Sequence, residues 1–192
     1  MPFLNDDSDM KIIGADGKQP SDGIDTCAFL EETGKQHFNG NMAKAKALGR
    51  DIVSAFSYRS VPENIAALIE RYGIERSKVL SDEIRILCVF CAEYCMDEYL
   101  PSPLLSTASA AEMFDVLGDM MPAFYEQLSH SASFSFYYLC IRDKSDLPVK
   151  IGKAFAEMCD DPKNEALISF AGELFECYVK IFRKAIQGYA FV

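Results

Sequence analysis

Tryptophan is absent from this 192-residue sequence, and histidine occurs only twice. With two histidines, a Ser/His or Cys/His catalytic mechanism has few ways to be built. The Glu-x-x-His step of di-iron helical bundles is missing as well. The sequence also lacks the short motifs of P-loops, dinucleotide-binding turns, zinc proteases and serine hydrolases. The sequence therefore contains none of these common catalytic motifs from which a function could be assigned.

Export signals and long apolar runs are missing too. The first residues have neither the basic nor the apolar segment of a secretory signal peptide. The longest uncharged stretch near the middle, residues 127–141, is too short and too polar to span a bilayer. The seven cysteines are an odd number in a chain without an export signal, which favours reduced thiols over a disulfide framework. We therefore expect a cytoplasmic protein that does not enter a membrane.

Basic residues are missing from residues 86–141, although the whole chain contains 19 lysines and arginines and carries a formal net charge of −10. Such an acidic stretch repels phosphate backbones, so we expect no nucleic-acid partner. Carboxylates without nearby bases attract cations or basic partners. Six carboxylates of this stretch form the candidate acidic surface: Glu93, Asp97, Glu112, Asp115, Asp119 and Glu126.

Apolar residues make up 49% of the sequence, enough to bury a sizeable core. Helix caps and breakers follow one another from residue 23 onward, which predicts an all-α, single-domain bundle of six to eight helices over residues 23–192. Residues 1–22 are polar and rich in turn signals, so we expect a flexible tail. The expected helix starts are Asn41, the capping box Ser60–Glu63, Ser81, the capping box Ser109–Glu112, Ser131, Ser145 or Asp146, and Asp161-Pro162.

The C-terminal segment has the widest apolar face, which predicts a long helix ending at Gly188. A helix with such a face packs on several neighbours, so we expect the bundle to form around it, with this helix in a central or buttressing position. One stripe consists of Leu167, Phe170, Ala171, Leu174, Tyr178, Ile181 and Ala185. A second stripe beside it consists of Ile168, Phe175, Phe182 and Ile186.

Three thiols at helical spacing, Cys88, Cys91 and Cys95, allow two interpretations. They could converge on a metal ion or cluster from one helix face. They also fall on the same arc as Ile84 and Leu87, where small buried hydrophobic residues belong. Metal-binding cysteines come more often from loops, and the sequence has no second CxxC pair. We therefore expect buried core thiols, with no metal and no cofactor.

Two classes of function remain compatible with this sequence. The first is a non-catalytic binding or regulatory module that uses the acidic surface or a pocket lined by aromatic side chains. The aromatic candidates are Phe134, Phe136, Tyr137 and Tyr138. The alternative is a metal-dependent all-α enzyme that uses the clustered carboxylates. The absence of motifs favours the binding module, whose partner would be another protein or a basic ligand. The sequence is also compatible with a homo-oligomer.

Deleting residues 1–22 tests the expected division of the chain. This segment has too little apolar content to offset the entropy of ordering it. The thermal midpoint, followed by circular dichroism, should therefore stay within a few degrees of that of the parent. A loss of helicity on truncation would mean that residues 10–13 are packed against the fold.

Overall fold

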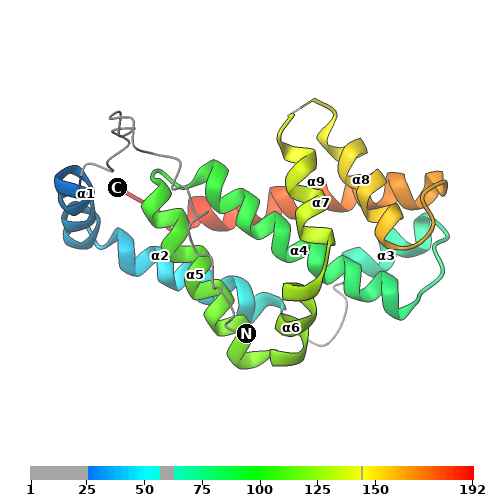
Figure 1. The fold of residues 1–192 in the computed structure, drawn as a ribbon, viewed down its shortest axis with the longest axis horizontal. Helices are drawn as coiled ribbons and strands as arrows, with labels where there is room; N and C mark the ends of the chain where they lie inside the picture. Colours follow the sequence, from blue (N-terminus) through cyan, green and yellow to red (C-terminus); the bar gives the residue numbers. More distant parts are fainter. Residues whose placement is uncertain (1–25, 57–62, 144) are drawn as a thin grey trace, which may run out of the picture.

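The computed structural model describes residues 26–56, 63–143 and 145–192, and every regular element among them is an α-helix (Figure 1). The all-α class is therefore confirmed. The described residues form nine helices, because Pro122 starts a new helix where the sequence allowed either a kink or a restart. The bounds are α1 Thr26–Phe38, α2 Asn41–Phe56, α3 Glu63–Arg71, α4 Lys78–Tyr99, α5 Pro103–Met120, α6 Pro122–His130, α7 Ser133–Ile141, α8 Leu147–Met158 and α9 Glu165–Gly188.

Several helix ends follow directly from the local sequence. Gly73 adopts φ +64° after α3, and the Ile74 N–H donates to the Ile69 carbonyl, as in a Schellman motif. Asp146 precedes α8, and α9 ends at Gly188. The boundaries at Asp146 and Gly188 agree with the expected ones. The capping box at residues 60–63 and the expected tail at residues 1–22 lie outside the described residues.

Three predicted helix starts were wrong, because the residue at the actual helix start lies three to seven residues away from each. The Ser77 side chain caps α4 by accepting from the Leu80 N–H at 3.0 Å, so Ser81 lies inside the helix. Ser102 precedes Pro103 at the first turn of α5, which leaves Ser109 buried in the middle of that helix. Asn164, rather than Asp161, caps α9. A Ser or Asp with the right spacing identifies a cap only when no competing cap precedes or follows it.

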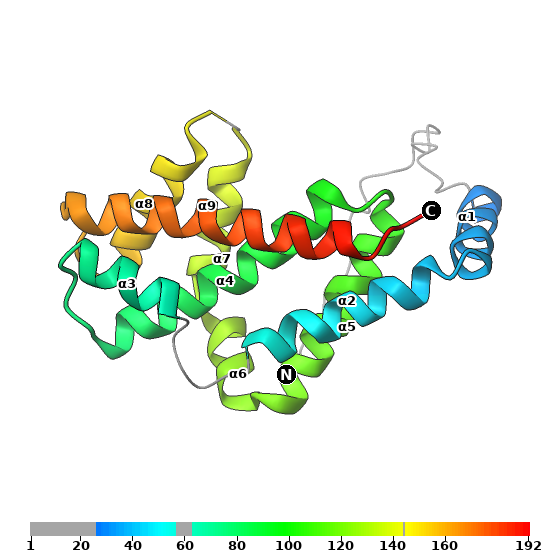
Figure 2. The same ribbon diagram turned by 180° about the vertical axis from the view of Figure 1, so that it is seen from behind.

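The most enclosed helix is α4. Seven consecutive residues, 86–92, are buried, and seven residues spaced by about 100° point in every direction around a helix. Helices α5, α7, α8 and α9 pack around α4. Figure 2 shows α9 running across the fold beside α4. Ile181 and Ala185 of the expected apolar stripe are exposed, so α9 buttresses α4 with one face and meets solvent with another.

Helix α1 lies at one end of the fold and packs against α2 (Figures 1 and 2). Three of its apolar side chains, Phe29, Leu30 and Phe38, are exposed. At the same end, the residues after α9 reach α2, where Lys44 donates to the Ala190 carbonyl at 2.8 Å and Tyr189 donates to Asp51. None of the described helices is both long and apolar enough to cross a membrane.

Two glycines allow pairs of helices to approach closely. A Cβ atom at Gly152 of α8 would collide with the Ile168 carbonyl of α9. A Cβ atom at Gly49 of α2 would collide with the Ser109 carbonyl of α5. The collision is with backbone in both pairs, so a larger residue can be accommodated only if the helices move apart.

Replacing either glycine by alanine should therefore destabilise the fold. We expect Gly152→Ala and Gly49→Ala each to lower the free energy of unfolding by about 1–3 kcal/mol, measured by chemical denaturation. Gly34→Ala in α1 is the matched control, because nothing lies within 4 Å of the added Cβ. That variant should gain about 0.5–1 kcal/mol from helix propensity alone. Equal effects at all three positions would contradict the close helix contacts.

Candidate functional site

The six carboxylates of the expected acidic surface do not lie in equivalent surroundings. Glu112 on α5 faces α2, where Arg50 Nη1 lies 2.6 Å from its Oε1 and Lys46 Nζ lies 4.0 Å from its Oε2. Its basic partners come from a segment about sixty residues earlier in the chain. The lack of basic residues in the surrounding sequence therefore does not leave Glu112 without counter-charge.

Glu93 and Asp97 on α4 are held by neighbouring hydroxyl groups. Burial raises the pKa of Glu93, while its hydrogen bond with Tyr138 of α7 acts in the opposite direction. The charge of Asp97 raises this pKa further. Asp97 itself accepts a hydrogen bond from Ser106 of α5. Both carboxylates therefore take part in the packing of α4 against its neighbours.

The other three carboxylates, Asp115, Asp119 and Glu126, are exposed, as is Asp97. Among the described residues, no three His, Cys, Asp or Glu side chains come together in a way that could hold a metal ion. The carboxylates of α4, α5 and α6 thus do not converge on one point in the described chain. The geometry gives no support to a metal-dependent enzyme built on them.

The three cysteines of α4 are buried, as expected from their spacing. Burial raises the pKa of all three thiols, and it raises that of Cys95 to about 12. The Cys95 Sγ lies 3.9 Å from the Val179 carbonyl of α9, and Cys88 hydrogen-bonds with Tyr178. These thiols pack the interface between α4 and α9.

Three of the four aromatic residues of α7 pack against Phe90 of α4. Tyr137 is completely buried, and its ring centre lies 5.2 Å from that of Phe90 on α4. Phe134 and Tyr138 also contact the Phe90 ring, at centre distances of 5.9 and 5.4 Å. Phe136 is exposed. These rings attach α7 to α4, with Phe90 at the centre of the cluster.

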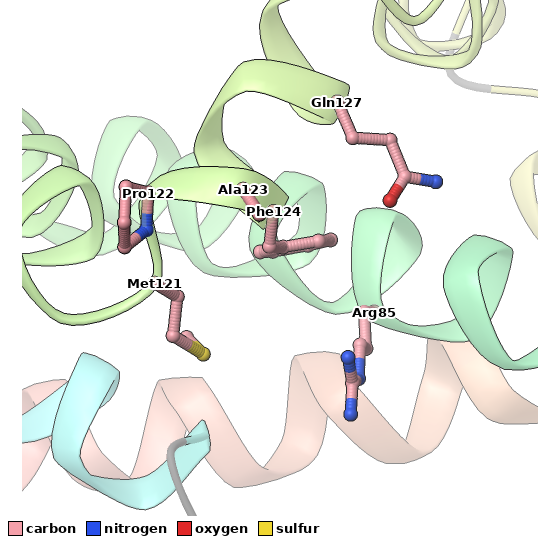
Figure 3. A pocket seen from close by; sticks show the side chains of 6 residues that line it. All are labelled: Arg85, Met121, Pro122, Ala123, Phe124 and Gln127. Carbon is pink, nitrogen blue, oxygen red and sulfur yellow. The ribbon is translucent and has the colours of Figure 1, made fainter.

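An open hollow of about 340 Å³ lies between α4 and α6. Its position follows from the break at Met121, whose backbone leaves the helical conformation before Pro122 starts α6. Phe124, which is buried, anchors α6 to the core. Figure 3 shows Arg85 on α4 beside Phe124, with its guanidinium end directed away from Gln127. The lining residues are Arg85, Met121, Pro122, Ala123, Phe124 and Gln127.

Arg85 is the only charged residue in this lining. It is exposed, and no described residue forms an ion pair with it. The other lining side chains are apolar except for the Gln127 amide. A guanidinium beside apolar surface can bind a carboxylate through two parallel hydrogen bonds while the surface takes an apolar group. In the sequence, Arg85 only marked the start of the stretch without basic residues.

A second open hollow, of about 350 Å³, lies between α8 and α9, and its lining includes Val149, Ile168 and Cys177. Glu173 on its rim already has partners, because Arg71 forms an ion pair with it and the Tyr72 hydroxyl donates to it at 2.9 Å. The hydrogen bond with Arg71 lowers the pKa of Glu173. This charge stabilises the contact of α3 with α9, so the hollow between α4 and α6 is the better candidate site.

No protein-family model matches this chain, and neither a curated protein nor a solved structure shows significant similarity to it.

The burial of the α4 thiols predicts very different reactivities within one molecule. In the native protein, Cys27 is exposed, whereas Cys88, Cys91 and Cys95 are buried and weakly acidic. A thiol reagent at about pH 8 should modify Cys27 quickly, because only the accessible thiolate reacts. The three α4 cysteines should react only as fast as the protein unfolds, followed by mass spectrometry of the labelled peptides. Rapid labelling of all three in the folded protein would contradict their place in the core.

Proposed function

We propose that this protein is a non-catalytic helical binding module whose hollow between α4 and α6 binds a small carboxylic acid with an apolar body. The observation that carries the proposal is the Arg85 guanidinium, which lies at apolar surface without an ionic partner among the described residues. The volume of about 340 Å³ is within the range of small-molecule sites.

The chemistry of the lining favours binding over catalysis. Arg85 is permanently protonated, so it does not serve as a general base at neutral pH. The other lining residues are Met, Pro, Ala, Phe and Gln, none of which is an activated nucleophile or an acid–base group. A hollow of this composition can orient a carboxylate and cover an apolar group, which is the task of a binding site.

A binding module could also act by docking a basic protein on the acidic surface, but fewer observations support this. Asp115 and Asp119 are exposed on α5, but Glu112 on that helix is already paired with Arg50. A cytoplasmic location is also a proposal. It is supported by the six cysteines from Cys88 to Cys177, which form no disulfide in the described part of the chain.

The proposed site predicts selective binding of an aromatic acid. In a titration followed by two-dimensional NMR, 3-phenylpropionate should shift the amide signals of Arg85 and of residues 121–127. The neutral analogue 3-phenylpropanamide should bind more weakly, because it lacks the charge that Arg85 recognises. Replacing Arg85→Gln should raise the Kd for the acid by about tenfold or more, since hydrogen bonds to charged groups contribute about 1.5–3 kcal/mol.

Arg142→Gln is the control, because Arg142 is an exposed arginine at the end of α7 and does not line the hollow. This variant should bind the acid as the parent does. Equal binding of the acid and the amide, or shifts spread over the whole surface, would contradict the proposal.

A further inference from the structure

A carboxyl group is buried where α4 meets α7. Glu83 is 5% exposed and lies on the apolar face of α4 between Leu80 and Leu87, which are also buried. Lysine, arginine and histidine are absent from its partners among the described residues. An ionised carboxylate in such a place loses its hydration without gaining a counter-ion, so its charged form is disfavoured.

Two hydroxyl groups of α7 hold this carboxyl group. The Ser133 hydroxyl donates to Glu83 Oε2 at 2.9 Å, and the Tyr137 hydroxyl donates to Oε1 at 2.5 Å. Ser133 and Tyr137 are four residues apart, so they lie on the same face of α7. The Ser131 hydroxyl, just before α7, donates in turn to Ser133 at 2.9 Å. All the polar contacts of Glu83 with α7 therefore depend on the docked position of that helix.

The other titratable groups near Glu83 are acidic or neutral. Asp82, its neighbour on α4, raises the pKa of Glu83. Cys159, the cap at the end of α8, is close enough for Glu83 to raise its thiol pKa, as do Asp160 and Asp161.

The remaining neighbours of α4 direct their polar groups elsewhere. Tyr178 of α9 bonds with Cys88, and Ser106 of α5 bonds with Asp97. The Nδ1 atom of His130, at the end of α6, lies 2.8 Å from the Glu126 carbonyl. None of these groups supplies a positive charge to Glu83.

We propose that the Glu83 carboxyl group is a protonation-controlled latch, which holds α7 against α4 when it is neutral and loosens this contact when it ionises. Released α7 would uncover the aromatic cluster around Phe90, because Phe134, Tyr137 and Tyr138 cover that ring. The latch is independent of the proposed ligand site, since Arg85 follows Glu83 by two residues and so points about 200° away on the helix.

The direction of the pH effect follows from the two states of Glu83. In docked α7, burial raises the pKa of Glu83, with the hydrogen bonds from Tyr137 and Ser133 acting in the opposite direction. With α7 released, the carboxyl group meets water and has an ordinary pKa. The docked state therefore binds the proton more tightly. Docking is strongest below the ordinary carboxyl pKa and weakens as the pH rises through the raised pKa.

Amide hydrogen exchange of α7 tests the latch. After correction for the intrinsic pH dependence of exchange, the protection of α7 amides relative to those of α9 should fall as the pH is raised from about 4.5 to 8. The fall should reach up to about tenfold per pH unit between the ordinary and the raised pKa of one group. In Glu83→Gln, which stays neutral, the amide oxygen can accept from one hydroxyl group and the amide N–H can donate to the other, so the protection of α7 should not change with pH.

Asp82→Asn is the matched control, because it removes the adjacent carboxyl group and leaves Glu83 in place. This variant should still lose α7 protection as the pH rises, with the fall moved to slightly lower pH because the Asp82 charge no longer raises the pKa of Glu83. The parent also supplies a test that needs no substitution, since the side-chain ¹³C signal of Glu83 should titrate over the same pH range as the α7 protection. An ordinary pKa for Glu83, constant α7 protection in the parent, or a Glu83→Gln variant that keeps the parent's pH dependence would each overturn the proposal.

Discussion

The enclosure of α4 is the constraint on which the described structure depends. Its residues 86–92 are buried without interruption, so this helix needs apolar partners on every side. Helix α9 supplies one of them, with Tyr178 and Phe175 against the α4 surface. Helix α7 supplies another through the rings around Phe90. Apolar surface removed from water contributes about 25 cal/mol for each Å², so this enclosure stabilises the fold.

The helical class could be predicted from the sequence because its signals are local. Asn41 and Gly188 mark helix ends at short range, and the apolar stripes of α9 follow from the helical period. The burial of Cys88, Cys91 and Cys95 was predictable for the same reason. Choosing between competing caps was not, because Ser77 and Ser81 are both suitable residues and packing decides which of them begins the helix.

The candidate site was much less predictable, because it depends on contacts between distant segments. The acidic stretch contains no base, yet α2 brings Arg50 to Glu112. The hollow at Arg85 exists only because the break at Met121 places α6 opposite α4. Glu83 did leave a signal, as a lone carboxylate in line with Leu80 and Leu87, but only the fold shows that two hydroxyl groups of α7 meet it. A single helix thus carries a buried acid on one side and an exposed base on the other.

The enclosure of α4 can be tested directly by native-state hydrogen exchange across the whole chain. Amides of residues 86–96 should exchange only through global unfolding, so that their exchange free energies match the free energy of unfolding. Amides of α1, which packs against α2 at one end of the fold, should exchange through local opening at much lower free energy. If the α4 amides exchanged as readily as those of α1, α4 would not be the enclosed centre of this fold.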